Sequence, residues 1–94
     1  MAMSDRVQTR IALFCYAAVS RQFAEMQNPR NRGQAFTWET FPERMATHCD
    51  LHLKINVKLP ASSEAESRAH ASRTGRAIAH DLVMAMSDAT LPTL

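Results

Sequence analysis

The sequence predicts a small α+β domain in the order helix, short antiparallel β-strand or hairpin, helix, completed by homo-oligomerisation. Residues 4–28 and 62–87 carry apolar side chains at helical spacing, whereas residues 50–60 alternate apolar and polar positions. A chain of 94 residues buries only about 60–65% of its unfolded surface, so association with a second copy is a natural way to bury more.

The composition is that of a globular protein with one domain, 1–94, and loose termini at 1–3 and 89–94. Apolar residues make up 46% and charged residues 21%, which argues against disorder. The two glycines cannot form a glycine-rich phosphate cradle, and the two cysteines exclude a disulfide scaffold. The net charge of +2 is too small to indicate nucleic acid by itself.

Clear boundary signals delimit the first helix. Ser4 is a candidate N-cap, with Asp5 in the first turn, where the helix dipole favours an anion. Pro29 disfavours helical geometry at Asn28, so we expect the helix to end there. Arginines before the apolar run imitate a secretory signal, but Asp5 and the continuation of the pattern to Met26 favour a structural helix.

The run from Ile11 to Val19 is apolar on every side of this helix. It is far shorter than the roughly 20 residues that span a bilayer, so we expect no membrane partner. A small monomer can hardly bury such a helix on all sides. It is therefore either a central core helix or one that also forms a subunit interface, through Ile11 and Phe14. Two thiols without an export signal favour the cytoplasm.

Two less regular segments follow. Residues 28–34 are a loop by composition. Arg30 and Arg32 make this loop the best candidate in the chain for contacting phosphate, and a solvated connection is the alternative. Residues 35–41 alternate as a strand would, and Pro42 then ends regular pairing.

The alternation over residues 50–60 predicts a half-buried antiparallel strand that Pro60 ends. A single strand is not stable alone, so its partner must be residues 35–41, the same strand of a second subunit, or both. We expect pairing across a dimer axis. The residues of the strand expected at this interface are Leu51, Leu53, Ile55 and Val57.

The last helix is predicted to begin at Ser62 or Ser63, because Ser63 and Glu66 have capping-box spacing. Its expected buried seam has small residues in its first half and large ones in its second: Ala65, Ala69, Ser72, Gly75, Ala79, Leu82, Val83 and Met86. A glycine in mid-helix costs about 1 kcal/mol relative to alanine, so we expect Gly75 to have a packing reason.

One side of the last helix is basic. Arg73, Arg76 and His80 share it at i, i+3 and i+7. Together with Arg30 and Arg32 they could bind phosphates or an acidic protein surface, and a solvated charged face is the alternative.

Three of the six aromatic residues lie between residues 36 and 41. Phe36, Trp38 and Phe41 form either a core cluster or, with the neighbouring arginines, an exposed binding surface that Phe36 and Trp38 anchor.

Neither catalysis nor metal binding is predicted. There is no Gly-x-Ser-x-Gly nucleophile motif, so we expect no enzyme. His48 and His52, with Cys49 between them, resemble metal ligands, but on a strand the two histidines would lie about 13 Å apart. Only on a helix would this spacing converge, so we expect neither metal nor cofactor.

Residues 51–60, Leu-His-Leu-Lys-Ile-Asn-Val-Lys-Leu-Pro, are followed by a helix and then by residues 88–91, Asp-Ala-Thr-Leu. This order resembles the strand, helix and tail of phage tail-terminator proteins, which are small α+β proteins that assemble as rings. The resemblance covers under half of the chain. It implies a protein of phage or mobile-element origin that acts through assembly.

The function that these patterns predict is non-enzymatic protein–protein interaction, as a cytoplasmic adaptor or inhibitor that forms a homo-oligomer, most simply a dimer. Two alternatives stay open. One is a phosphate-binding module for nucleic acid or a nucleotide on the arginine-rich face, and the other is phage tail assembly in the cytoplasm of a bacterial host.

Overall fold

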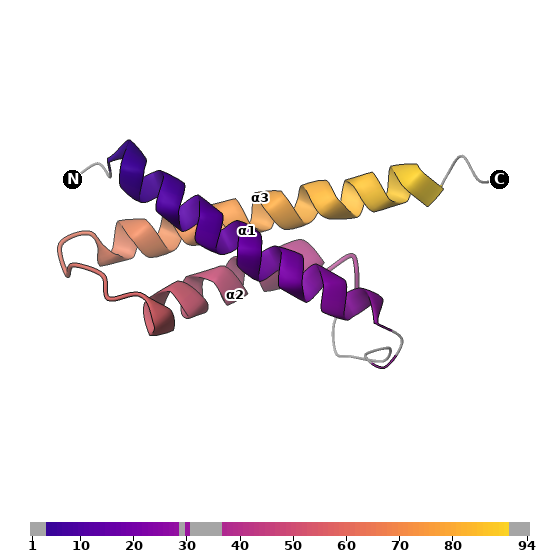
Figure 1. The fold of residues 1–94 in the computed structure, drawn as a ribbon, viewed down its shortest axis with the longest axis horizontal. Helices are drawn as coiled ribbons and strands as arrows, with labels where there is room; N and C mark the ends of the chain where they lie inside the picture. Colours follow the sequence, from indigo (N-terminus) through magenta and orange to yellow (C-terminus); the bar gives the residue numbers. More distant parts are fainter. Residues whose placement is uncertain (1–3, 29, 31–36, 91–94) are drawn as a thin grey trace.

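The computed structural model describes residues 4–28, 30 and 37–90, and over these residues the fold is all-α. It contains three helices, α1 (Asp5–Gln27), α2 (Phe41–Asn56) and α3 (Glu64–Thr90). Helices α2 and α3 form an antiparallel hairpin, and α1 lies diagonally across it (Figure 1). The molecule measures 51 × 25 × 16 Å and is therefore thin. The predicted α+β fold is wrong, because the described residues contain no strand.

Both ends of α1 are as the sequence predicts. The backbone N–H of Val7 donates to the Ser4 hydroxyl at 3.3 Å, and the N–H of Asn28 donates to the Glu25 carbonyl oxygen at 3.1 Å. These bonds satisfy backbone groups that lack a partner within the helix. Because they depend on residues close in sequence, the boundaries can be predicted without knowing the tertiary fold.

The predicted strand over residues 50–60 is the main error, because residues 50–56 belong to α2. A second pattern is superimposed on the alternation: Phe41, Met45, Cys49 and Leu53 recur every fourth residue, and all four are buried. This spacing places them on one helical face. The longer pattern determines the structure, since it buries four side chains against the other helices.

Pro42 has a different role from the one that the sequence predicts. Pro42 lies in the first turn of α2, where its missing N–H costs no hydrogen bond and its fixed φ suits a helix. It therefore begins the helix, and the prediction that it ends a strand is wrong. The expected strand over residues 35–41 also fails where the structure describes it, because residues 37–40 form a turn. In this turn the N–H of Thr40 donates to the Thr37 carbonyl oxygen at 3.1 Å.

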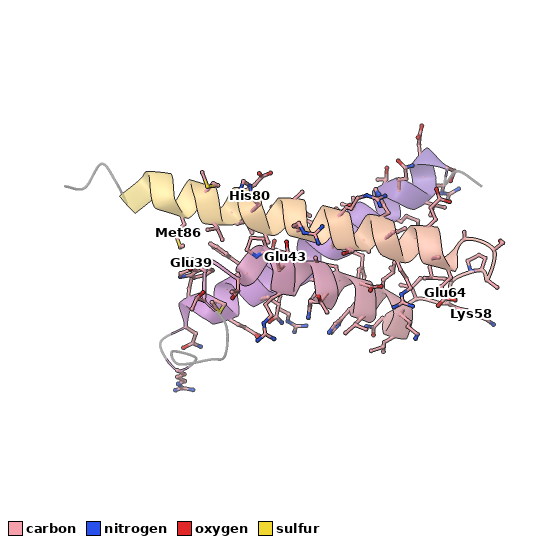
Figure 2. The ribbon with its side chains drawn as sticks, turned by 180° about the vertical axis from the view of Figure 1, so that it is seen from behind. Glu39, Glu43, Lys58, Glu64, His80 and Met86 are labelled. Carbon is pink, nitrogen blue, oxygen red and sulfur yellow. The ribbon has the colours of Figure 1, made fainter. Side chains whose placement is uncertain are left out.

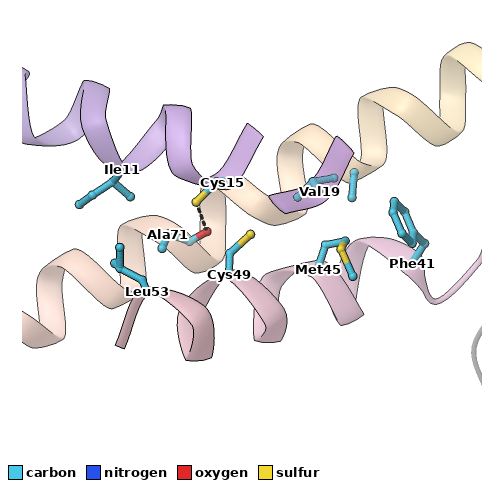
Figure 3. Close-up of a cluster of buried hydrophobic side chains, with 9 residues drawn as sticks. Ile11, Cys15, Val19, Phe41, Met45, Cys49, Leu53 and Ala71 are labelled. Atoms are coloured by element: carbon cyan, nitrogen blue, oxygen red, sulfur yellow. Dashed lines mark hydrogen bonds between the residues drawn. The ribbon is translucent and has the colours of Figure 1, made fainter. Parts of the chain in front are cut away.

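All three helices contribute to one core, which Figure 3 shows in close-up. Its buried apolar members are Ile11, Cys15, Val19, Phe41, Met45, Cys49, Leu53, Ala71 and Ala79. At one end, Phe23 and Trp38 pack against Phe41, with ring centroids 6.1 and 5.5 Å from that of Phe41. The core interpretation of Trp38 therefore agrees with its half-buried position.

The buried seam of α3 runs through Ser67, Ala71, Gly75 and Ala79, at intervals of four residues. Gly75 and Ala79 also belong to the seam that the sequence predicts. Ala65 and Ala69 belong to that predicted seam too, but they are exposed. The expectation for Gly75 is confirmed. A Cβ added there would lie 2.6 Å from the Cys49 sulfur and 2.8 Å from the Met45 carbonyl oxygen.

Helix α1 contacts the α2–α3 hairpin close to Gly75. The Cys15 Sγ donates to the Ala71 carbonyl oxygen at 3.5 Å, which links α1 to α3 (Figure 3). The neighbouring Cys49 thiol, followed by burial, raises the pKa of Cys15 above its usual range. Both cysteines are free and buried, so at neutral pH the Cys15 side chain behaves as a small core residue with a weak donor.

Replacing Gly75 with alanine should destabilise the fold. The new methyl group must displace the Met45 backbone, and such overpacking costs about 1–3 kcal/mol, against a gain of about 1 kcal/mol in helix propensity. We expect the denaturation midpoint to fall. Ala77→Gly, at an exposed position of α3, measures the propensity difference alone. A Gly75→Ala protein more stable than the wild type would contradict the close packing.

Candidate protein-binding groove

A groove runs between α1 and α2. Its first section, about 500 Å³, lies between Val7, Arg10 and Phe14 of α1 and the end of α2 with the chain that follows it. A middle section of about 420 Å³ shares Phe14 with the first. A third, of about 460 Å³, shares Gln22 and His48 with the middle section. Because neighbouring sections share lining residues, the three adjoin one another along the boundary between α1 and α2, and we refer to them together as the groove.

The lining of this groove follows helical spacing. On α1 it includes Val7, Phe14 and Ala18, which lie on one face of the helix. On α2 it includes His48, His52 and Asn56, at intervals of four residues. Leu59 and Pro60 continue the apolar lining beyond α2. The groove is therefore built mainly from two rigid helices.

The charged residues that line the first two sections are basic. Arg10 and Lys58 line the first section, and Arg21 lines the middle one. No aspartate or glutamate is among the described lining residues of these sections, and Glu43 enters only in the third. An apolar groove with basic edges favours a ligand that combines apolar and acidic groups.

Two histidines stack in the middle section. The ring centroids of His48 and His52 are 3.9 Å apart. Burial, followed by the proximity of His52, lowers the pKa of His48, and Glu25 partly opposes this effect. The folded protein therefore favours the neutral form of His48.

The predicted basic residues of α3 do come together. Arg73, Arg76 and His80 line a hollow of about 350 Å³, but Glu43 and Asp81 line it too. Figure 2 shows Glu43 of α2 and His80 of α3 on the same side of the hairpin. The surface that the sequence predicts to be basic therefore also contains two carboxylates, Glu43 and Asp81.

An ion pair engages Arg76. Its Nε and Nη2 donate to the two carboxylate oxygens of Glu43 at 2.8 and 3.1 Å, so the pair is bidentate. This contact raises the pKa of Arg76 and lowers that of Glu43. Arg68 makes a comparable contact with Asp50, at 2.6 Å from Nε to Oδ1. Both pairs join α2 to α3.

The remaining predicted binding residues are scattered. Arg30 is exposed, and its backbone N–H donates to the Asn28 side chain at 3.0 Å. Arg32 and Phe36 lie outside the described residues. Trp38 packs on Phe23 with a centroid distance of 5.2 Å.

The predicted oligomer interface divides between core and surface. Ile11 and Leu53 are buried within the chain itself, and Phe14 lines the groove. The other three members are exposed on α2 or just after it, and the most exposed is Ile55, at 75%. These three are Leu51, Ile55 and Val57.

Sequence reasoning missed the outer face of α1, which we define as Leu13, Tyr16, Ser20 and Ala24. Leu13 is 65% exposed and Tyr16 is 60% exposed. The signal was present in the run that is apolar on every side. The chain buries only one side of that run, through Ile11, Cys15 and Val19, because the molecule is too thin to cover the other.

Comparison with protein-family models, curated proteins and solved structures finds no match to this chain. The resemblance to phage tail-terminator proteins depends on a strand in residues 51–60, where the structure has the last part of α2 and the irregular chain that follows it. No helix in the described part of the chain is long and apolar enough to cross a membrane.

The lowered pKa of His48 predicts a specific loss of stability in acid. The unfolded histidine, with a pKa near 6.5, takes up a proton before the folded one does. The contribution of His48 to the free energy of unfolding should therefore be complete above pH 6.5 and decline as the pH falls below it. The measurement is denaturant unfolding between pH 7.5 and 5, for the wild type and His48→Gln.

The difference between these two proteins should change with pH in that window. His80→Gln, which removes an exposed histidine from α3, is the matched control and should retain the dependence due to His48. Parallel curves for the wild type and His48→Gln would show that burial of His48 has no effect on stability.

Proposed function

We propose that this chain is a non-enzymatic protein-binding module, a cytoplasmic adaptor or inhibitor, whose groove between α1 and α2 accepts an amphipathic helix of a partner protein. The apolar face of that helix would be flanked by acidic residues. The observation that carries this proposal is the pair of adjoining hollows between α1 and α2, whose exposed lining is mostly apolar and whose charged lining residues are all basic. The two free cysteines agree with a reducing compartment.

The dimensions of the groove suit a helix. From Val7 to Gln22 the lining of α1 extends over 15 residue steps, or about 22 Å at 1.5 Å per residue. A partner helix of about four turns has this length. Its apolar residues, spaced three or four apart, would face Phe14, Ala18 and Leu59, as helices bound in apolar grooves do.

Charge determines which helix fits. Arg10 and Arg21 lie on the α1 side of the groove, and Lys58 lies near its other edge. Acidic residues beside the partner's apolar face would pair with them, whereas a second copy of α1 would bring its own arginines against them. The groove is therefore better suited to a different protein than to self-association.

The protein-binding proposal has more support than the phosphate-binding alternative. Arg76 is held by Glu43, and Asp81 lies 3.8 Å from the His80 Nδ1. A phosphate at the α3 face would compete with these carboxylates for the same cations. No aspartate or glutamate is among the described residues that line the first two sections of the groove.

Self-association remains a second candidate, through the outer face of α1. The exposed Leu13 and Tyr16 lie toward its N-terminal half, and the small residues Ser20 and Ala24 lie toward its C-terminal half. In an antiparallel pair related by a two-fold axis, the large residues of one copy face the small residues of the other. A homodimer of this kind would leave the groove accessible to a partner.

Peptide binding tests the groove. The probe is a fluorescent synthetic helix of about 16 residues, with leucines on one face and glutamates beside them. We expect Arg21→Glu to weaken binding by about fivefold, or ~1 kcal/mol, because a pairing cation at the edge becomes repulsive. Arg73→Glu makes the same charge change on α3, outside the groove, and should not. Equal weakening in both variants, or equal affinity for a lysine-flanked peptide, would contradict the proposal.

The oligomeric state tests the outer face of α1. The wild type should sediment as a dimer at high concentration, and Leu13→Glu should sediment as a monomer with unchanged helical circular dichroism. Met84→Glu introduces the same charge at a half-exposed apolar residue of α3 and should remain dimeric. A wild type that stays monomeric throughout would exclude this interface.

A further inference from the structure

His48 and His52 both lie on α2, so their geometry differs from the one that a strand would give them. On α2, His48 and His52 are separated by one helical turn, a spacing that places Cβ atoms about 5–6 Å apart on one face. Their rings are in contact, with centroids 3.9 Å apart. The distance that a strand would place between the two histidines therefore does not prevent them from binding one metal ion.

The two imidazoles are also accessible and uncommitted. Both line the middle section of the groove, and His52 is exposed while His48 is half-buried. Within the described part of the chain, neither ring has a hydrogen bond to another protein group. Their nitrogen lone pairs can thus be offered to a ligand in the groove without breaking a contact that stabilises the fold.

We propose that His48 and His52 form a two-imidazole site for a divalent transition-metal ion, with Cu²⁺ bound more tightly than Ni²⁺ or Zn²⁺. Imidazole nitrogen is a preferred ligand of all three ions, and Cu²⁺ has the highest affinity of the divalent series. Two imidazoles one turn apart can bind the same ion at about 2.0–2.1 Å once the rings rotate so that one nitrogen of each faces the ion.

The site would leave coordination positions open. The described residues include no group of three histidine, cysteine, aspartate or glutamate side chains that could hold a metal. Water or an added ligand would therefore complete the coordination shell, and the ion would lie at the groove surface. The proposal does not depend on which partner occupies the groove.

Calorimetric titration of the purified protein with Cu²⁺ at pH 7 tests the site. We expect one ion per chain and an increase in Tm on binding. His48→Gln and His52→Gln should each weaken binding by about 100-fold, because each removes one of two tethered ligands. His80→Gln is the control for adventitious binding to surface histidines and should bind as the wild type does.

Circular dichroism of each metal-free variant establishes that it is folded. Wild-type affinity in His48→Gln or His52→Gln would overturn the proposal, as would equal weakening in His80→Gln. Failure of the peptide to bind the groove would leave these results unaffected, so the two proposals can fail separately.

Discussion

Helices α2 and α3 approach each other closely at Gly75, and the packing of all three helices follows from this contact. No space exists there for even a Cβ, since it would lie 2.6 Å from the Cys49 sulfur. Ala71 and Ala79, one turn before and after, are also small and fully buried. Together these residues let α2 pack close to α3 and bring Cys15 of α1 to the same level, where it bonds the Ala71 carbonyl.

The groove is a consequence of this packing. Helix α1 crosses the hairpin diagonally, and α1 and α2 diverge toward the N-terminus of α1 (Figure 1). Their facing sides remain partly uncovered there, between Phe14 and the end of α2. The described residues form three helices in a molecule 16 Å thick along its shortest axis, and none of these residues fills that space. A fourth helix from a partner would bury the apolar lining, which is the physical basis of the proposed function.

Sequence patterns predict the features that depend on interactions between neighbouring residues. They fail for α2, whose structure depends on packing between helices. The limits of α1 follow from Ser4 and the proline after Asn28, and Gly75 was recognisable because a mid-helix glycine has a cost. In α2 two periodicities coexist: the alternation around Leu53 predicts a strand, but the side chains that are buried follow the four-residue spacing. Choosing between them requires the positions of α1 and α3, which no single segment contains. Because residues 50–60 are predicted as a strand, the sequence places His48 and His52 far apart and gives no indication of the groove.

Amide chemical shifts of the isotopically labelled protein, titrated with the glutamate-flanked helical peptide, would show both the helix and the binding surface. We expect helical shifts throughout residues 41–56 and peptide-induced changes concentrated at Phe14, Ala18, His52 and Leu59. Changes centred instead on the α3 face around Arg73 would contradict this expectation. Extended-chain shifts over residues 50–56 would contradict the fold on which the groove depends.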